Sequence, residues 1–205
     1  MRRWTLGLFM MGVALFSSGC LHLSRTSTAP FQYEPVPVPH EKAIPRSVGL
    51  NILIDDRPRG DRVRTRNIEN LPEKITEKLT EDFRKLQIFK AIHFPATEMD
   101  DVVITGTIKR FSWRAYENPL GCLPLVSLLR ATGMPLGLAS GVVDIRLEGK
   151  DRKTGAGLGV VRGLSHAHSI FNLYDEGPDW TGVELGESFR AAEAQLNEGM
   201  VSKLQ

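Results

Sequence analysis

Two histidines in the C-terminal third of the chain have a spacing that could serve metal chemistry. His166 and His168 are separated by one residue in a stretch with strand-forming composition, so their side chains would project from the same face. Asp144 or Glu148 could add a third ligand from the neighbouring strand of a hairpin. The chain contains no His-x-x-x-His or Cys-x-x-Cys pair, and solvated polar residues on a strand face are the competing interpretation. We therefore predict no metal and no cofactor.

Nucleophilic catalysis has still less support in the sequence. The nearest approach to a Gly-x-Ser-x-Gly elbow is Gly163-Leu-Ser165-His-Ala, which lacks the second glycine of the tight turn. The glycines of Gly155-Ala-Gly-Leu-Gly159 lie between two predicted strands, with no helix N-terminus to receive a phosphate. We predict that the protein is not an enzyme, and we keep a hydrolase or a metal-binding protein as the alternative.

A local group of arginines is the candidate anion site. Arg binds phosphate through a bidentate fork, so such a group could hold the head group of a phosphorylated glycolipid or another lipid. Acidic residues at 55, 56 and 61 interrupt the group, which makes a solvated loop with internal ion pairs the alternative. The candidate residues for anion or partner binding are Arg57, Arg59, Arg62, Arg64 and Arg66.

The N-terminus predicts export and lipid attachment. Arg2 and Arg3 precede a mostly apolar run from residue 5 to residue 16, which has the length of a signal-peptide core and is too short to span a bilayer. Ser18 and Gly19 then lead into Cys20. This pattern resembles the lipobox of bacterial lipoproteins, with Ser17 where that family usually has Leu. The resemblance implies that residues 1–19 are removed and that Cys20 carries acyl chains, which anchor essentially permanently.

A second interpretation of the same segment stays open. Ser17-x-Gly19 also suits the ordinary signal peptidase, in which case Cys20 would be a thiol that could pair with Cys122 in an oxidising compartment. Leu21 after the cysteine, by resemblance to enteric sorting patterns, implies the outer membrane, with the inner membrane as the alternative.

Composition argues against nucleic acid as a partner. The formal charge of the chain is +2, with 26 Lys and Arg against 24 Asp and Glu. Removing Arg2 and Arg3 with the signal leaves 24 of each, so the mature chain has no global basic field. Residues 20–46 then read as a Pro-rich tether, in which the Pro35–Pro39 stretch favours an extended polyproline II spacer.

Residues 47–205 are predicted to form one domain with two helices. Asn70 and Glu73 could cap a first helix, on which Ile75, Leu79, Phe83 and Leu86 form an apolar stripe. Glu77, Lys78, Glu81, Asp82 and Lys85 are assigned to its solvent face. Thr181 and Glu184 could cap a final helix, with an apolar stripe of Leu185, Phe189, Ala192, Leu196 and Met200.

Strands are predicted between and before these helices. The segments are residues 48–54, 91–94, 101–116, 143–147 and 158–170, with turns at 55–60 and 151–155. The apolar residues of the third segment change from the face of Ile108 to the face of Phe111 and Trp113, which indicates a bulge or two differently covered faces. The order β-α-β-β-β-β-α predicts an α+β fold, a largely antiparallel sheet with two helices packed on one face.

An apolar insertion at residues 119–140 interrupts this pattern. It contains one basic residue and no acidic residue, and its prolines and glycines exclude a regular spanning helix. It could cover the second sheet face near Phe111 and Trp113, or it could be an exposed docking surface. The residues of that candidate surface are Leu123, Leu125, Leu128, Leu129, Met134 and Leu136.

Several short motifs together resemble small, mostly uncharacterised bacterial envelope lipoproteins. They are Asp55 and Arg57 after the first strand, Thr105–Thr107 in the long strand, and the turn Asp151–Gly155. The general plan is similar to the lipopolysaccharide-assembly lipoprotein and to TolB amino-terminal domains. The resemblance implies a membrane-anchored periplasmic module that binds an envelope protein or glycolipid during envelope assembly. A periplasmic hydrolase or metal-binding protein is the alternative function.

Overall fold

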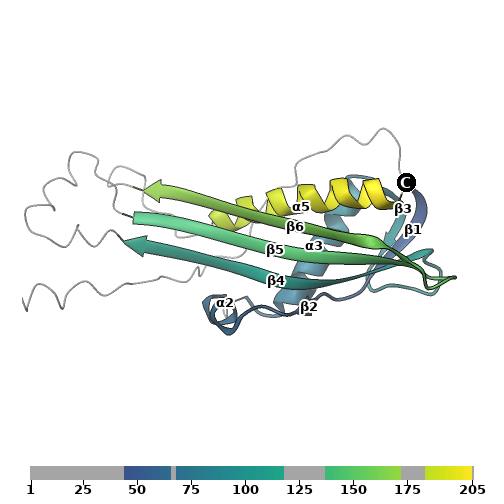
Figure 1. The fold of residues 1–205 in the computed structure, drawn as a ribbon, viewed down its shortest axis with the longest axis horizontal. Coiled ribbons are helices and arrows are strands. Elements are labelled where there is room, and N and C mark those ends of the chain that lie inside the picture. Colours follow the sequence, from purple (N-terminus) through teal and green to yellow (C-terminus); the bar gives the residue numbers. More distant parts are fainter. Residues whose placement is uncertain (1–43, 66–67, 118–136, 172–182, 205) are drawn as a thin grey trace, which may run out of the picture.

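The computed structural model describes residues 44–65, 68–117, 137–171 and 183–204. Its strands are β1 (Ile44–Leu50), β2 (Ile54–Asp55), β3 (Phe89–His93), β4 (Val102–Glu117), β5 (Gly137–Asp151) and β6 (Gly157–Phe171). The sheet order is β3-β1-β4-β5-β6, with β2 paired to β4 beyond the end of β1. β1 runs parallel to β3 and β4, while the long strands β4, β5 and β6 are antiparallel (Figure 1). The predicted largely antiparallel sheet is confirmed.

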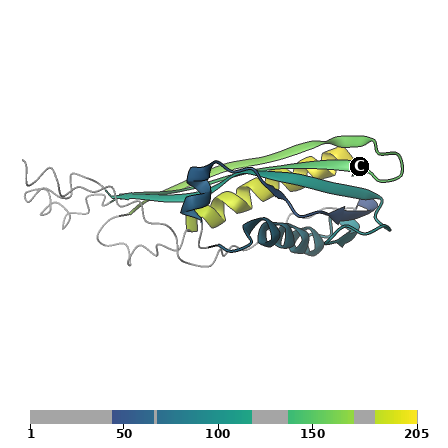
Figure 2. The same cartoon turned by 90° about the horizontal axis from the view of Figure 1, so that it is seen from below.

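The helices are α2 (Arg59–Arg64), α3 (Leu71–Lys85) and α5 (Val183–Leu204). α3 and α5 lie on the same face of the sheet, as the predicted α+β fold requires (Figure 2). The short helix α2 was not expected, because the Pro and Gly of residues 55–60 predicted only a turn. None of the helices in the described ranges is long and apolar enough to cross a membrane.

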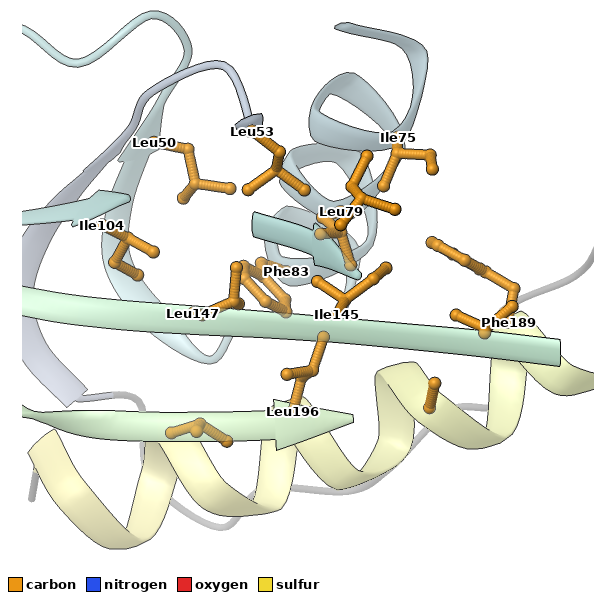
Figure 3. Close-up of a cluster of buried hydrophobic side chains, with 14 of the residues drawn as sticks. Leu50, Leu53, Ile75, Leu79, Phe83, Ile104, Ile145, Leu147, Phe189 and Leu196 are labelled. Atoms are coloured by element: carbon orange, nitrogen blue, oxygen red, sulfur yellow. The ribbon is translucent and has the colours of Figure 1, made fainter. Parts of the chain in front are cut away.

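The apolar stripes of both long helices form the core. Ile75, Leu79 and Phe83 of α3 are buried, and Leu86 packs against them. Figure 3 shows the three buried side chains of α3 gathered with Ile145 and Leu147 of β5 and with Phe189 and Leu196 of α5. The five predicted core residues of α5 are all buried. The 3.6-residue periodicity therefore identified the packed face of each helix correctly.

Two local predictions about the helices are wrong. Asn70 precedes α3 in a left-handed conformation with φ 51°, and its side chain makes no capping hydrogen bond, so the capping box does not form. Asp82 was assigned to the solvent face but has no exposed surface, because α5 covers that side of α3. Glu184 of α5 is buried and accepts a hydrogen bond from Trp113 Nε1 at 2.7 Å, whereas Thr181, with which it was expected to cap the helix, lies outside the described residues.

A β-bulge in β4 explains the change of apolar face. The pairing register of β4 and β5 shifts between Ile108 and Arg110. The extra residue lets Ile108 and Phe111 both point to the helix side, where each is fully buried. Phe111 packs edge-on against Phe189, with ring centroids 6.3 Å apart. Phe111 and Trp113 therefore contact α5, and residues 119–136, which could also cover them, lie outside the described ranges.

Several element boundaries differ from the expected ones, and the predicted strand at residues 48–54 is divided between β1 and β2. β1 begins at Ile44, within the segment predicted as tether, because Ile44 is 1% exposed and pairs with Phe89 of β3. β5 begins at Gly137, so the last four residues of the predicted insertion are part of the sheet. The rest of residues 119–140 lies outside the described ranges, as do residues 1–43.

Candidate functional site

The sheet face turned away from α3 and α5 is the candidate binding surface, and we call it the outer face. Side chains alternate along each strand, so every second residue of β4, β5 and β6 points to this face. These residues are exposed or half-buried, whereas their neighbours form the core. The outer face includes Val103, Thr105, Thr107, Leu138, Val142, Arg146, Glu148, Val160, Arg162, Leu164, His166, His168 and Ile170.

Two arginines stand directly opposite each other at the centre of the outer face. Arg146 of β5 is the register partner of Arg162 of β6, and both are exposed. Arg162 donates from Nε and Nη2 to the two carboxylate oxygens of Asp144, at 2.9 and 2.7 Å, and this interaction raises its pKa. Arg146 has no ion-pair partner among the described residues.

This arrangement can hold an anion. Like charges directly opposite each other on neighbouring strands repel, so an anionic group between them would stabilise the pair. Arg146 can donate all its guanidinium hydrogens to an incoming phosphate or carboxylate, since no described acceptor competes for them. The outer face therefore offers one free guanidinium beside one that is already held in place.

Exposed apolar side chains flank the two arginines. Val160 and Leu164 are the outer-face neighbours of Arg162 along β6, and they are 40% and 37% exposed. Leu138 on β5 and Ile170 on β6 form a second apolar pair at 40% and 65% exposure. Basic and apolar groups thus lie side by side, which suits a ligand that carries an anionic and an apolar part.

The candidate metal ligands do not form a complete site within one chain. His166 and His168 lie on the same outer face, as their spacing predicted, and both are exposed. The carboxylate of Asp144 binds Arg162, and Glu148 pairs with Lys150 at 3.4 Å. Within the described residues, no three His, Cys, Asp or Glu side chains are grouped closely enough to hold a metal ion.

Arg57 of the predicted anion cluster is engaged inside the protein. It is 6% exposed, and its Nε and Nη2 donate to Asp55 at 2.8 Å each. Its Nη1 donates to Thr65 Oγ1 at 2.6 Å and to the Phe111 carbonyl oxygen at 3.4 Å. The bond from Arg57 lowers the pKa of Asp55. The Asp-x-Arg motif therefore joins the loop before α2 to β4.

The other arginines of that cluster, as far as the structure describes them, do not form an anion-binding site with Arg57. Arg59 and Arg62 are exposed on α2, where Arg62 Nε donates to the Arg57 carbonyl oxygen at 2.8 Å. Asp61 between them is buried and lies near Arg110 and Arg114 of β4. The side chain of Arg64 and the whole of Arg66 lie outside the described part of the structure.

His93 and Asp100 form a carboxylate–imidazole pair at the far end of the sheet. Asp100 Oδ1 lies 2.5 Å from His93 Nδ1, and Oδ2 accepts from the nitrogen and hydroxyl of Thr97. Burial opposes ionisation of Asp100, but the bonds from His93 and Thr97 outweigh it and lower its pKa. Among the described residues, no hydroxyl or thiol bonds to the other nitrogen of His93. The pair fixes the loop before β4.

The predicted apolar docking surface lies outside the described residues. This holds for Leu123, Leu125, Leu128, Leu129, Met134 and Leu136. The Arg146–Arg162 pair was not predicted, although a signal for it exists. A hairpin turning at residues 151–155 brings these two positions near each other, and the alternation of Val143–Leu147 already placed Arg146 on the outer side.

Comparisons with known proteins identify the fold. No family model and no curated protein sequence matches the chain. Among solved structures, it is similar to protein XCC0632 of Xanthomonas campestris, family DUF330, with TM-score 0.51, 6% identity, and coverage of 84% of this chain and 93% of that one. The chain shares the fold of that protein.

Two further solved structures match less well. Lipoprotein GNA1162 of Neisseria meningitidis has TM-score 0.39 and 12% identity, with coverage of 75% of this chain and 99% of that one. PelC of Paraburkholderia phytofirmans, crystallised as a dodecamer, has TM-score 0.39 and 8% identity, with coverage of 80% and 92%. The likeness to the lipopolysaccharide-assembly lipoprotein and TolB stays a prediction.

Proposed function

We propose that this protein is a lipid-anchored, non-enzymatic module of the bacterial envelope, which binds a phosphorylated glycolipid on its outer face. The observation that carries the proposal is the Arg146–Arg162 pair, placed beside Val160 and Leu164 on a sheet face that neither long helix covers. Phosphate groups suit the guanidinium fork, and acyl chains suit the apolar neighbours.

The N-terminus supports the place of action. A diacylated Cys20 would hold the domain at a membrane surface, and residues 21–43 would separate the two. The Neisseria relative is itself called a lipoprotein, which agrees with this assignment. By the resemblance to enteric sorting patterns, the membrane would be the outer membrane, seen from the periplasm.

The binding proposal is tested in cells by site-specific photo-crosslinking of the whole acylated protein. A benzoylphenylalanine at Thr107, the register partner of Arg146, should form an adduct whose added mass is that of a glycolipid. The same probe at Glu77, exposed on α3, is the control and should form none. Arg146→Glu should remove the Thr107 adduct without lowering the melting temperature, because Arg146 has no described ion pair.

Other outcomes decide against parts of the proposal. A protein adduct at Thr107 would show that the ligand is a protein and not a glycolipid. Adducts of equal yield at Thr107 and Glu77 would show that the outer face is not the binding surface. Lipid attachment is tested separately: the mature protein should begin at Cys20 and carry the mass of diacylglycerol, and Cys20→Ser should release or mislocalise it.

A further inference from the structure

The free edge of β6 carries unpaired backbone groups. Within the described ranges β6 is the last strand of the sheet, and no strand pairs with its other edge. The Ala167 amide donates to Ser188 Oγ at 2.8 Å, and this hydroxyl donates to the Gly141 carbonyl oxygen of β5 at 2.9 Å. The amide of Ala167 therefore points toward β5. Because peptide groups alternate, those of residues 164, 166, 168 and 170 point to the free edge.

Helix α5 covers one part of this edge and leaves another part open. Gln195 accepts from the Leu164 amide at 2.9 Å and donates to the Leu164 carbonyl oxygen at 3.0 Å. Figure 1 shows α5 crossing β6 at an angle, so that the last residues of β6 extend past the start of the helix. No described group bonds to the edge amides of His166, His168 and Ile170. As far as the described residues extend, these three residues form an open segment.

The open segment is complementary to a second copy of itself. In an antiparallel pairing with its two-fold axis at Ala167, His166 lies opposite His168 of the second copy, and their edge groups point toward each other. The same register sets Leu164 opposite Ile170 of the second copy, so two exposed apolar side chains cover each other once the second strand displaces the Gln195 side chain from the Leu164 backbone. An exposed strand edge is the part of a sheet most able to accept another strand.

This pairing would collect four imidazoles on the outer face. Within a single chain His166 and His168 offer two nitrogens, and Asp144 is held by Arg162, so the site is incomplete. Opposite residues of paired strands have Cβ atoms about 4.5–5.5 Å apart, and residues i and i+2 lie about 7 Å apart. Zn²⁺ favours four ligands in tetrahedral geometry and binds neutral imidazole about 2.0–2.1 Å from the nitrogen.

We infer that two copies of this protein pair through the open edge of β6 and bind one Zn²⁺ between His166 and His168 of both copies. A second copy supplies what one chain lacks, namely two further nitrogens in symmetric positions. A strand from an unrelated partner would pair with the edge without completing the ligand set. The metal thus selects self-association over other edge contacts.

Sedimentation velocity of the whole mature protein in detergent tests this inference. Added ZnCl₂ should convert monomer to dimer at neutral pH, EDTA should reverse it, and native mass spectrometry should find one zinc per two chains. His166→Ala with His168→Ala should weaken the zinc-dependent association by about 100-fold or more, because all four ligands disappear.

Two further variants separate metal binding from strand pairing. Ile170→Lys keeps both histidines and adds a charge at a position that is 65% exposed, so the fold should survive while dimerisation weakens about tenfold or more. His93→Gln removes a half-buried imidazole from the opposite edge strand and should leave association unchanged. A protein that stays monomeric with zinc would overturn the inference. So would a dimer that forms equally well with EDTA or in the double histidine variant.

Discussion

The carboxyl groups of Asp82 on α3 and Glu193 on α5 repel one another in the layer between the two helices. Asp82 has no exposed surface, and neither of its carboxylate oxygens has a hydrogen-bond partner; Lys78 Nζ lies 3.9 Å from Oδ1. Glu193 is 3% exposed and accepts a bond of 3.5 Å from Asn197. Two acids therefore share a buried space with weak compensation.

This relationship makes stability depend on pH. Burial, and then the charge of Glu193, raises the pKa of Asp82 to about 7 from an ordinary 3.8, while Lys85 on the same helix opposes the rise. Burial raises the pKa of Glu193 to about 7 from 4.5, against the influence of Asn197 and Lys78. In the folded state both groups hold protons more tightly than in the unfolded state. The stability that comes from this tighter proton binding is fully present below about pH 4, and it is lost as the pH rises through about 7.

Asp82→Asn should flatten this pH profile, because the amide carries no charge at any pH. We expect the variant to gain about 1–3 kcal/mol over the parent protein at pH 8 and to lose that advantage by about pH 4. Urea unfolding at four pH values between 4 and 8 measures the free energy of unfolding of both proteins. Asp100→Asn is the opposite control: the pKa of Asp100 is lowered, so that variant should be destabilised at pH 7 and match the parent at low pH. Equal pH slopes for Asp82→Asn and the parent would contradict the prediction.

The buried bond from Trp113 to Glu184 should contribute to stability. Trp113→Phe keeps most of the ring but leaves Glu184 Oε2 without this donor, which should cost about 1–3 kcal/mol. Glu184→Gln should cost less, because its amide oxygen can still accept from Trp113 and its amide can donate to Ser169. Chemical unfolding separates the two variants. Glu187→Ala, exposed on the same helix, is the neutral control. If Trp113→Phe leaves the free energy of unfolding unchanged, the bond does not stabilise the fold.

Close contact between α5 and the sheet should make one glycine irreplaceable. A Cβ at Gly163 would lie well inside van der Waals contact with the Ala192 carbonyl oxygen, a backbone atom that cannot turn away. Gly163→Ala should therefore displace α5 and cost about 1–3 kcal/mol. Gly157→Ala on the same strand meets nothing within 4 Å and should be close to neutral. Equal melting temperatures for the two variants would contradict the prediction.

Arg57 should act in folding rather than in ligand capture. Arg57→Ala removes the donors to Asp55, Thr65 and the Phe111 carbonyl oxygen, and we expect a loss of about 2–4 kcal/mol. Arg59→Ala, exposed on α2, should change stability by less than about 0.5 kcal/mol. Thermal unfolding decides this, and a stable Arg57→Ala protein with weakened anion binding would restore the cluster as a binding site.

Local pattern determined much of the fold. The stripes at Ile75, Leu79 and Phe83 and at Leu185, Phe189 and Leu196 follow the helical period, so the sequence predicted both helices and their packed faces. The change of face after Ile108 indicated a bulge, because a strand alternates strictly unless a residue is inserted. These features depend on neighbours along the chain, which the sequence displays directly.

Contacts between distant segments were decided only by the tertiary structure. Asp82 is a charged residue on the polar side of its helix, so the sequence placed it in solvent. In the structure α5, more than a hundred residues later in the chain, buries it beside Glu193. The sequence placed Arg57 in a surface cluster, whereas in the structure it donates to the carbonyl oxygen of Phe111 in β4. The bond between Trp113 of β4 and Glu184 of α5 likewise joins two segments that are far apart in the sequence. Whether a charged side chain meets water or a partner depends on what packs over it, and periodicity along one segment carries no information about that.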